Sequence, residues 1–274
     1  MSIASKLTVG FLAAACMTTV SAAEEVILKI EKPDDFLQAK SVTESGNDAM
    51  SFKGARTLIS KQVIKIDPAK KYRISGEFCL KGGKPVSLSL GFVPYDKNKV
   101  QIYPNAVLGD NKTLTTVAED AKKGDKVVKL KDASKWDAKT PYSYIVFNAA
   151  EDYSDLPNRS MIHTVAPNAR QAGELWEITL KTPLKADIAA GTPVRQQRDG
   201  GTYIYTAGFF KTVGVWKTRT GTISGIAASG APSNKFWKGT ETVRVLILTL
   251  GGDKQSETEF RNIKVEEVKD VKQK

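Results

Sequence analysis

Near the C-terminus, the order of apolar and polar residues predicts two strands joined by a tight turn. Residues 241–250 place apolar side chains on both sides of an extended chain, which is typical of a strand buried on both faces. Gly251-Gly252-Asp253 supplies the turn. Residues 258–268 then alternate. Phe260 is out of phase with the apolar positions that follow it, so a β-bulge is predicted at Arg261-Asn262.

The same alternation appears earlier in the chain. Residues 72–80 and 86–93 place apolar side chains on one face and mostly small polar ones on the other. Gly/Pro turns separate these runs, and we find no helix-period segment of useful length. The pattern predicts an all-β protein, an antiparallel β-sandwich or jelly roll. Further strands are predicted at residues 26–30, 50–52, 58–66, 100–103, 202–206 and 216–223.

The middle of the chain has a different pattern of apolar and polar residues. Its predicted strands are short and lie between polar, turn-rich stretches, which indicates a small all-β subdomain at residues 105–198. Such an insertion is tolerated at an exposed loop between strands. The sandwich would then consist of residues 24–104 and 199–268, with a polar tail at 269–274. The predicted strands of the insert are 113–117, 126–130, 142–147, 175–180 and 191–195.

The N-terminus predicts export. Residues 1–23 contain a charged start at Lys6, an apolar run over 7–20 and small residues for cleavage, so they read as a signal peptide. The apolar run is too short and too rich in Ala and Thr for a transmembrane span. We expect a periplasmic or extracellular protein. A lipoprotein signal with Cys16 as the lipidation site is the less favoured alternative.

Composition narrows the class of partner. The 274 residues carry a formal net charge of +11, with lysines scattered along the chain. Scattered lysine is typical of a solvated surface, and it also attracts acidic partners such as anionic polysaccharide or envelope phosphate. Nucleic acid is not expected, because the chain is predicted to be exported and lacks a basic stripe with stacking aromatics. Cys79 is alone after signal cleavage and reads as a small buried hydrophobe.

Two blocks of predicted core strands resemble a known family. Residues 72–78, 88–92 and 95–96 form one block, and Phe260-Arg261-Asn262-Ile263-Lys264-Val265 forms the other. Both resemble the carbohydrate-binding modules of the galactose-binding-like β-jelly-roll type, which are appended to secreted glycan-degrading enzymes. The resemblance implies a jelly roll that binds glycan. Residues 105–198 have no counterpart in an ordinary module of this type.

The resemblance also implies a structural calcium ion near the first and last strands. The candidate ligands are Glu31, Asp34, Asp35 and Glu266. A calcium site needs several converging oxygen ligands, and solvated carboxylates at a strand end are the plainer interpretation. No other cofactor is predicted.

Catalytic chemistry finds little support in the sequence. One histidine, His163, and one mature cysteine are too few for the usual zinc sites, and no Gly-x-Ser-x-Gly motif or phosphate-binding loop occurs. We therefore favour a non-catalytic protein. The alternative is a polysaccharide lyase on uronate polymers, with His163 and Tyr205 transferring protons. Met161-Ile162-His163 and Tyr205-Thr206-Ala207-Gly208 faintly resemble alginate-lyase motifs, although the family's Gln and Lys are replaced.

Aromatic residues give the best binding candidates. Sugar-binding modules place flat rings against pyranoses and polar side chains against hydroxyls. The plainer interpretation is that most of these rings fill the core. We expect a stacking platform with arginine partners, made of Tyr203, Tyr205, Trp216, Trp237, Arg195, Arg198 and Arg219.

The favoured function is thus that of an exported, non-catalytic β-sandwich protein that binds glycan, including anionic polysaccharide. A uronate lyase and a structural or adhesive envelope protein are the two alternatives. The sequence does not determine the oligomeric state.

Overall fold

A computed structural model describes residues 24–269 of the chain. The predicted signal peptide, Cys16 within it, and residues 270–274 of the predicted tail lie outside the described residues. The described part is built from strands, which confirms the all-β class. None of its helices is long and apolar enough to cross a membrane. The helical segments are short 3-10 turns: η1 (Pro33–Asp35), η2 (Ala39–Ser41), η3 (Pro104–Ala106) and η4 (Asn111–Thr113).

Two antiparallel sheets form a sandwich. In the first, here called the β6 sheet, the order is β16-β6-β18-β3-β2, and β1 also pairs with β18. In the second, the β7 sheet, the order is β15-β7-β17-β4, and β5 also pairs with β17. The β6 sheet contains β16 (Lys217–Ser224), β6 (Lys71–Gly82), β18 (Glu257–Val268), β3 (Ala49–Lys53), β2 (Thr43–Gly46) and β1 (Glu24–Ile30). The β7 sheet contains β15 (Phe209–Lys211), β7 (Ser87–Tyr95), β17 (Thr242–Leu250), β4 (Thr57–Ile59) and β5 (Ile64–Lys65).

The core of the sandwich follows from the alternation seen in the sequence. Leu88, Leu90 and Phe92 of β7 point inward and are buried against Ile74 and Phe78 of β6. Each fully buried side chain of this size contributes roughly 1.5–3 kcal/mol through removal of apolar surface from water. Because successive strand residues point to opposite faces, the residues of β7 between these inward positions must point out of the sandwich. This outward phase positions the candidate site described below.

The closing hairpin is as predicted. β17 is buried on both faces, with Val245 and Leu246 both 0% exposed. Gly251 and Gly252 both adopt positive φ in the turn that follows. The register of β18 against β6 shifts between Arg261 and Lys264, which confirms the bulge.

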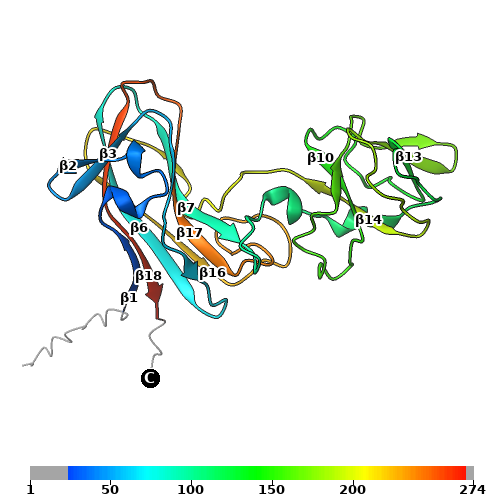
Figure 1. Ribbon diagram of the computed structural model, residues 1–274, viewed down its shortest axis with the longest axis horizontal. Coiled ribbons are helices and arrows are strands. Elements are labelled where there is room, and N and C mark those ends of the chain that lie inside the picture. The colour runs from blue at the N-terminus through cyan, green and yellow to red at the C-terminus, as the bar shows by residue number, and fades with distance from the viewer. Residues whose placement is uncertain (1–23, 270–274) are drawn as a thin grey trace, which may run out of the picture.

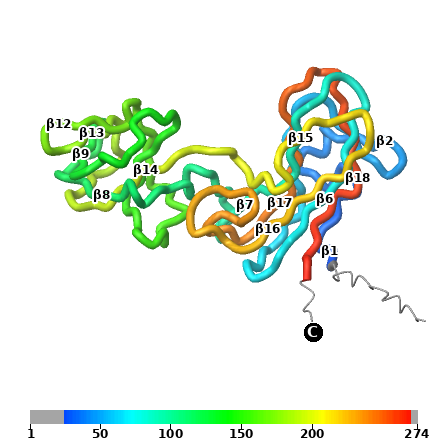
Figure 2. Tube along the Cα trace, turned by 180° about the vertical axis from the view of Figure 1, so that it is seen from behind, coloured from blue at the N-terminus to red at the C-terminus, as the bar shows by residue number. Residues whose placement is uncertain are grey.

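Residues 105–198 form two further sheets around their own hydrophobic cluster. One sheet has the order β11-β10-β14-β8 and the other β12-β13-β9. Figures 1 and 2 show these strands at one end of an elongated molecule and the sandwich at the other. The domain boundaries remain a prediction. The strands are β8 (Thr115–Thr116), β9 (Val127–Leu130), β10 (Ser143–Phe147), β11 (Met161–His163), β12 (Arg170–Ala172), β13 (Leu175–Thr179) and β14 (Pro193–Arg198). The buried cluster includes Val128, Leu130, Ile145, Ile178 and Val194.

Region 105–198 is fastened to the sandwich by polar contacts. The Arg159 guanidinium lies 2.9 Å from the Asp96 carboxylate, which follows β7. The amide of Gly230 donates to the carbonyl of Val107 at 2.8 Å, and the Val107 side chain is buried in the sandwich core. Region 105–198 therefore contacts the sandwich through side-chain and backbone interactions as well as through its two connecting segments.

Three predicted strands differ from the structure. Residues 100–103 form no strand, only an isolated bridge between Gln101 and Tyr95. Residues 58–66 are interrupted between β4 and β5, because Ser60 Oγ donates to the carbonyl of Gln62 and Arg244 donates to the carbonyls of Ser60 and Lys61. Residues 202–206 form only an isolated bridge, between Ile204 and Phe92. Strand β15 was not predicted.

Candidate functional site on an aromatic sheet face

The two outer faces of the sandwich differ in chemistry. The outer face of the β6 sheet carries ion pairs, such as Lys81 with Glu259 at 3.2 Å and Arg261 with Glu77 at 2.8 Å. Exposed pairs of this kind contribute only about 0–1 kcal/mol each to stability. The outer face of the β7 sheet instead carries a second apolar cluster, which partly buried tyrosines cover. A surface rich in apolar and aromatic groups on one sheet alone is a candidate interaction surface.

The strand register explains how the rings gather there. On β7, the outward positions run from Ser89 through Gly91 and Val93 to Tyr95, and Phe209 of β15 lies opposite Ser89. Beside this row, the rings of Tyr203 and Tyr205 pack on the apolar cluster. We call Tyr95, Tyr103, Tyr203, Tyr205 and Phe209 the tyrosine face.

Ring contacts make the tyrosine face continuous. The centroids of Tyr203 and Tyr205 lie 6.2 Å apart in an edge arrangement, and those of Tyr205 and Phe209 lie 4.7 Å apart. Tyr103 lies near enough to raise the pKa of both Tyr95 and Tyr203, after the larger effect of burial. Tyr103 and Phe209 are each 47% exposed, so the face is open to solvent.

The segment that carries Tyr203 and Tyr205 is held by its backbone. Ile204 exchanges hydrogen bonds with Phe92 at 2.9 and 3.0 Å, and its side chain points into the core. The residues on either side therefore point outward. Two glycines make this close approach possible. A Cβ at Gly91 would lie 2.0 Å from the Ile204 carbonyl oxygen, and one at Gly221 would lie 2.3 Å from the Thr206 carbonyl oxygen.

The hydroxyl groups of Tyr95, Tyr203 and Tyr205 are neutral at physiological pH. Burial raises the pKa of Tyr95, Tyr203 and Tyr205 above the ordinary value for a phenol. A neutral phenol both donates and accepts hydrogen bonds, and its ring offers an apolar face. The Arg244 guanidinium lies 6.0 Å from the Tyr95 ring centroid and donates to the Ser60 carbonyl at 2.7 Å. The face therefore combines flat rings, neutral hydroxyls and a fixed cation.

Only two of the seven predicted binding residues meet on this face, namely Tyr203 and Tyr205. Trp216 lies just before β16, and the Arg261 guanidinium stands over its ring at 4.4 Å, beside the charged outer face of the β6 sheet. Arg219 lies over the ring of Phe210 at 4.3 Å. Arg198 is exposed at the end of β14, in region 105–198.

The structure corrects the expectation for Trp237. Its side chain is 0% exposed and belongs to the sandwich core, where its indole N–H donates to the Pro232 carbonyl at 3.1 Å. A ring with no exposed face cannot stack on a ligand. The neighbouring Gly/Ser/Pro loop suggested exposure, but this loop covers the ring instead.

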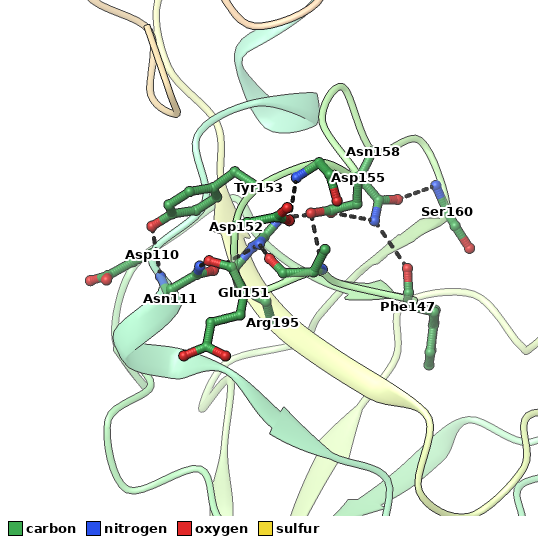
Figure 3. A network of polar contacts seen from close by, with 12 residues as sticks. Asp110, Asn111, Phe147, Glu151, Asp152, Tyr153, Asp155, Asn158, Ser160 and Arg195 are labelled. Carbon is green, nitrogen blue, oxygen red and sulfur yellow. Dashed lines mark hydrogen bonds and ion pairs between the residues drawn. The ribbon is translucent and has the colours of Figure 1, made fainter.

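The structure also corrects the expectation for Arg195. Figure 3 shows its guanidinium enclosed by Asp155, Asn111 and Tyr153. The Asp155 carboxylate lies 2.8 Å away, the Asn111 amide oxygen lies 2.8 Å away, and the Tyr153 ring centroid lies 5.1 Å away. The side chain is 0% exposed, so its charge is neutralised inside the protein and is not available to a ligand.

Two of the four predicted calcium ligands, Asp35 and Glu266, are engaged by other partners in the structure. Asp35 accepts hydrogen bonds from the amides of Glu31 and Lys32, at 2.9 and 3.1 Å. The Glu266 carboxylate is buried and pairs with Lys264 at 2.5 Å. Within residues 24–269, no group of three or more His, Cys, Asp or Glu side chains could hold a metal ion.

His163 and Tyr205, the pair of the lyase alternative, lie in different parts of the fold. The His163 ring stacks on Tyr144 in the β11-β10 pair, with the centroids 4.9 Å apart. Tyr205 belongs to the tyrosine face of the sandwich. Burial lowers the pKa of His163 and the nearby Lys181 lowers it further, while Asp199 opposes them. The structure thus gives the two residues no shared site.

Three residues of the tyrosine face were not predicted as site residues, namely Tyr95, Tyr103 and Phe209. Tyr95 continues the outward phase of a strand that was predicted, so the alternation contained a usable signal. Tyr103 joins the face only because residues 96–102 fold back, with the amide of Ile102 bonded to the Pro94 carbonyl at 3.0 Å. Phe209 lies in the unpredicted strand β15.

Comparisons with known proteins give little further information. Neither the protein-family models nor the curated proteins yield a match. A solved structure entitled "CBM4 structure and function" aligns over 89% of this chain and 94% of that chain, at 8% sequence identity and a TM-score of 0.32. A TM-score this low does not establish a shared fold.

Proposed function

We propose that this protein is exported, is not catalytic, and binds glycan on its tyrosine face. The observation that supports the proposal is the continuous row of partly exposed rings, from Tyr203 through Tyr205 to Phe209, on an otherwise apolar sheet face. Flat rings suit the apolar face of a pyranose, and neutral phenols suit sugar hydroxyls as both donors and acceptors.

The shape of the face favours a polymer as ligand. The rings lie along the open outer face of a sheet, and two of them are 47% exposed. A glycan chain can lie along such a face, with successive sugars meeting successive rings. A small ligand would normally be enclosed by a concave site that buries most of its surface.

The charge of the chain supports an acidic polymer. The chain carries a formal net charge of +11, of which Lys6 in the predicted signal peptide supplies one, and the remaining positive charge attracts polyanions over a distance that salt shortens. We therefore expect uronate polymers such as alginate and pectin to bind more tightly than neutral xylan or cellulose at low ionic strength. The difference should shrink as salt is added.

Substitution of the rings tests the function. Tyr203→Ala and Tyr205→Ala should each weaken glycan binding about tenfold, which corresponds to about 1.4 kcal/mol. Affinity electrophoresis and calorimetry against the four polymers would measure this.

The matched control is Trp216→Ala, which removes an aromatic ring beside the other sheet and should leave the affinity unchanged. If the wild-type protein binds none of a broad glycan panel, the proposed function is wrong. If Trp216→Ala alone weakens binding, the ligand lies on the other face.

A further inference from the structure

A second group of rings lies in region 105–198. Tyr142, Tyr144 and His163, here called the ring patch, stand at one end of the β10-β11 pair. The His163 ring centroid lies 4.9 Å from that of Tyr144 and 6.4 Å from that of Tyr142, and both tyrosine rings are inclined to the imidazole by 22°. The imidazole is therefore stacked with both tyrosine rings, and the three rings form one cluster.

The ring patch is exposed, and its backbone is strained. Tyr142 is 63% exposed and has a φ of +60°, in the left-handed region that bulky residues rarely adopt. Val165, two residues after His163, is 42% exposed. Folding gains little from an exposed ring held in a disfavoured backbone conformation. Such outliers concentrate at functional sites.

Polar groups surround the rings. The amide of Lys181 donates to the His163 carbonyl at 2.8 Å, which places Lys181 on the neighbouring strand segment. Its ammonium can donate hydrogen bonds to oxygen ligands. The imidazole, whose pKa is lowered by burial and by Lys181, is neutral at neutral pH and both donates and accepts hydrogen bonds. The patch thus offers the same combination of rings and hydroxyl-binding groups as the tyrosine face.

The chain path limits the distance between the two surfaces. The amide of Asp199 donates to the carbonyl of Tyr142 at 3.1 Å. From Asp199, the chain reaches Tyr203 in four steps, which span at most about 14 Å when fully extended. The ring patch and the tyrosine face are therefore neighbours on the molecule, within reach of a single oligosaccharide.

We propose that the ring patch is a second contact for the glycan chain that binds the tyrosine face. This inference rests on the proposed function. A chain that is long enough to reach both surfaces makes its second contact at high effective concentration, so its affinity rises without a tighter first contact. A chain that covers only the tyrosine face gains nothing from the ring patch.

A length series tests the proposal. The probes are xylan and alginate oligosaccharides, from disaccharide to octasaccharide. Tyr142→Asn removes the ring, and asparagine tolerates the left-handed backbone, so the variant should fold. We expect its affinity for the longest chains to fall about tenfold and its affinity for the disaccharide to stay unchanged. His163→Ala should give the same length-dependent loss. Val127→Asn, at another exposed apolar position of the region, is the matched control and should have no effect.

The outcomes separate the inference from the function. If Tyr205→Ala weakens binding while Tyr142→Asn leaves long chains unaffected, the ring patch is not a glycan contact and the proposed function stands. An equal loss for short and long chains would also overturn the inference. If wild-type protein binds no member of either series or of the broad panel, both the function and the inference are wrong.

Discussion

At Arg195, the interior of region 105–198 holds a full positive charge. The guanidinium is paired with Asp155, yet its Nε atom has no hydrogen-bond partner. Gly109 packs directly against it, since a Cβ there would lie 2.5 Å from Nε. The Asp155 carboxylate, the amide oxygen of Asn111 and the Ala150 carbonyl accept hydrogen bonds from three of the four terminal N–H groups. This arginine therefore organises the surrounding loops.

Removal of one partner of this pair should be costly. We expect Arg195→Met to lower the free energy of unfolding by about 3 kcal/mol, because it leaves the Asp155 charge poorly solvated and unpaired. The double variant Arg195→Met/Asp155→Leu should lose less than the sum of the two single losses. Urea unfolding would measure all three. Strictly additive losses would show that the two side chains do not act as a pair.

Single residues were the hardest feature to predict. Tyr203 and Tyr205 were correctly expected to share one side of the chain, because alternate residues of an extended segment point the same way, although the segment forms no strand. Trp237 and Arg195 were misjudged, because their burial depends on loops that pack over them from elsewhere in the chain. The local sequence indicates which side of a strand a side chain points to. It does not indicate whether a loop from elsewhere in the chain buries that side chain.

At the scale of elements, the segment at residues 203–207 positions the candidate site. Its amides and carbonyls bond to β7, and it passes close to Gly91 and Gly221. Because backbone atoms make these contacts, any side chain at either glycine must push the segment away. The position of the two tyrosine rings thus depends on two residues that carry no ring.

Gly91→Ala should weaken glycan binding by displacing the segment that carries Tyr203 and Tyr205. A methyl group there would lie 2.0 Å from the Ile204 carbonyl oxygen, so the segment must move. We expect a stability loss of roughly 1–3 kcal/mol, as in overpacked cores, together with weaker glycan binding. Gly82→Ala is the matched control, because no atom lies within 4 Å of the added methyl group. Normal binding by Gly91→Ala would show that the segment does not position the rings.

The long strands could be predicted from sequence, and the short ones could not. β6, β7, β17 and β18 carry enough alternating residues for the period to be evident, and the bulge appeared as a break in that period. β15 has only three residues, so no period can be recognised there. The gap between β4 and β5 depends on hydrogen bonds from Arg244, which is distant in sequence.

At the scale of the whole molecule, one buried carboxylate links the sandwich to region 105–198. Asp96 accepts hydrogen bonds from the amides of Asn98 and Val100, each at 2.9 Å, and pairs with Arg159 at 2.9 Å. Burial alone would raise the pKa of Asp96, but these donors together outweigh it and the pKa is lowered. The folded protein therefore favours the ionised carboxylate.

This lowered pKa makes the link sensitive to acid. A carboxyl group with a lowered folded pKa contributes stability that is present above its unfolded pKa, near 3.9, and that is lost as the pH falls through the folded value. Asp96→Asn should therefore be about 1 kcal/mol less stable than wild type at pH 7. The difference should shrink as the pH falls below the unfolded pKa and continue to shrink through the lower folded pKa. Thermal unfolding across this range would check it, and a constant difference at every pH would contradict the assignment.

The backbone bonds that hold residues 203–207 have a further consequence. A surface whose rings are already fixed needs little ordering when a partner arrives, so association loses little conformational entropy. Amide exchange along this segment should then be slow before any sugar is added and should change little afterwards. Glycan recognition at this face would then occur on a preorganised surface, with little conformational change in the protein.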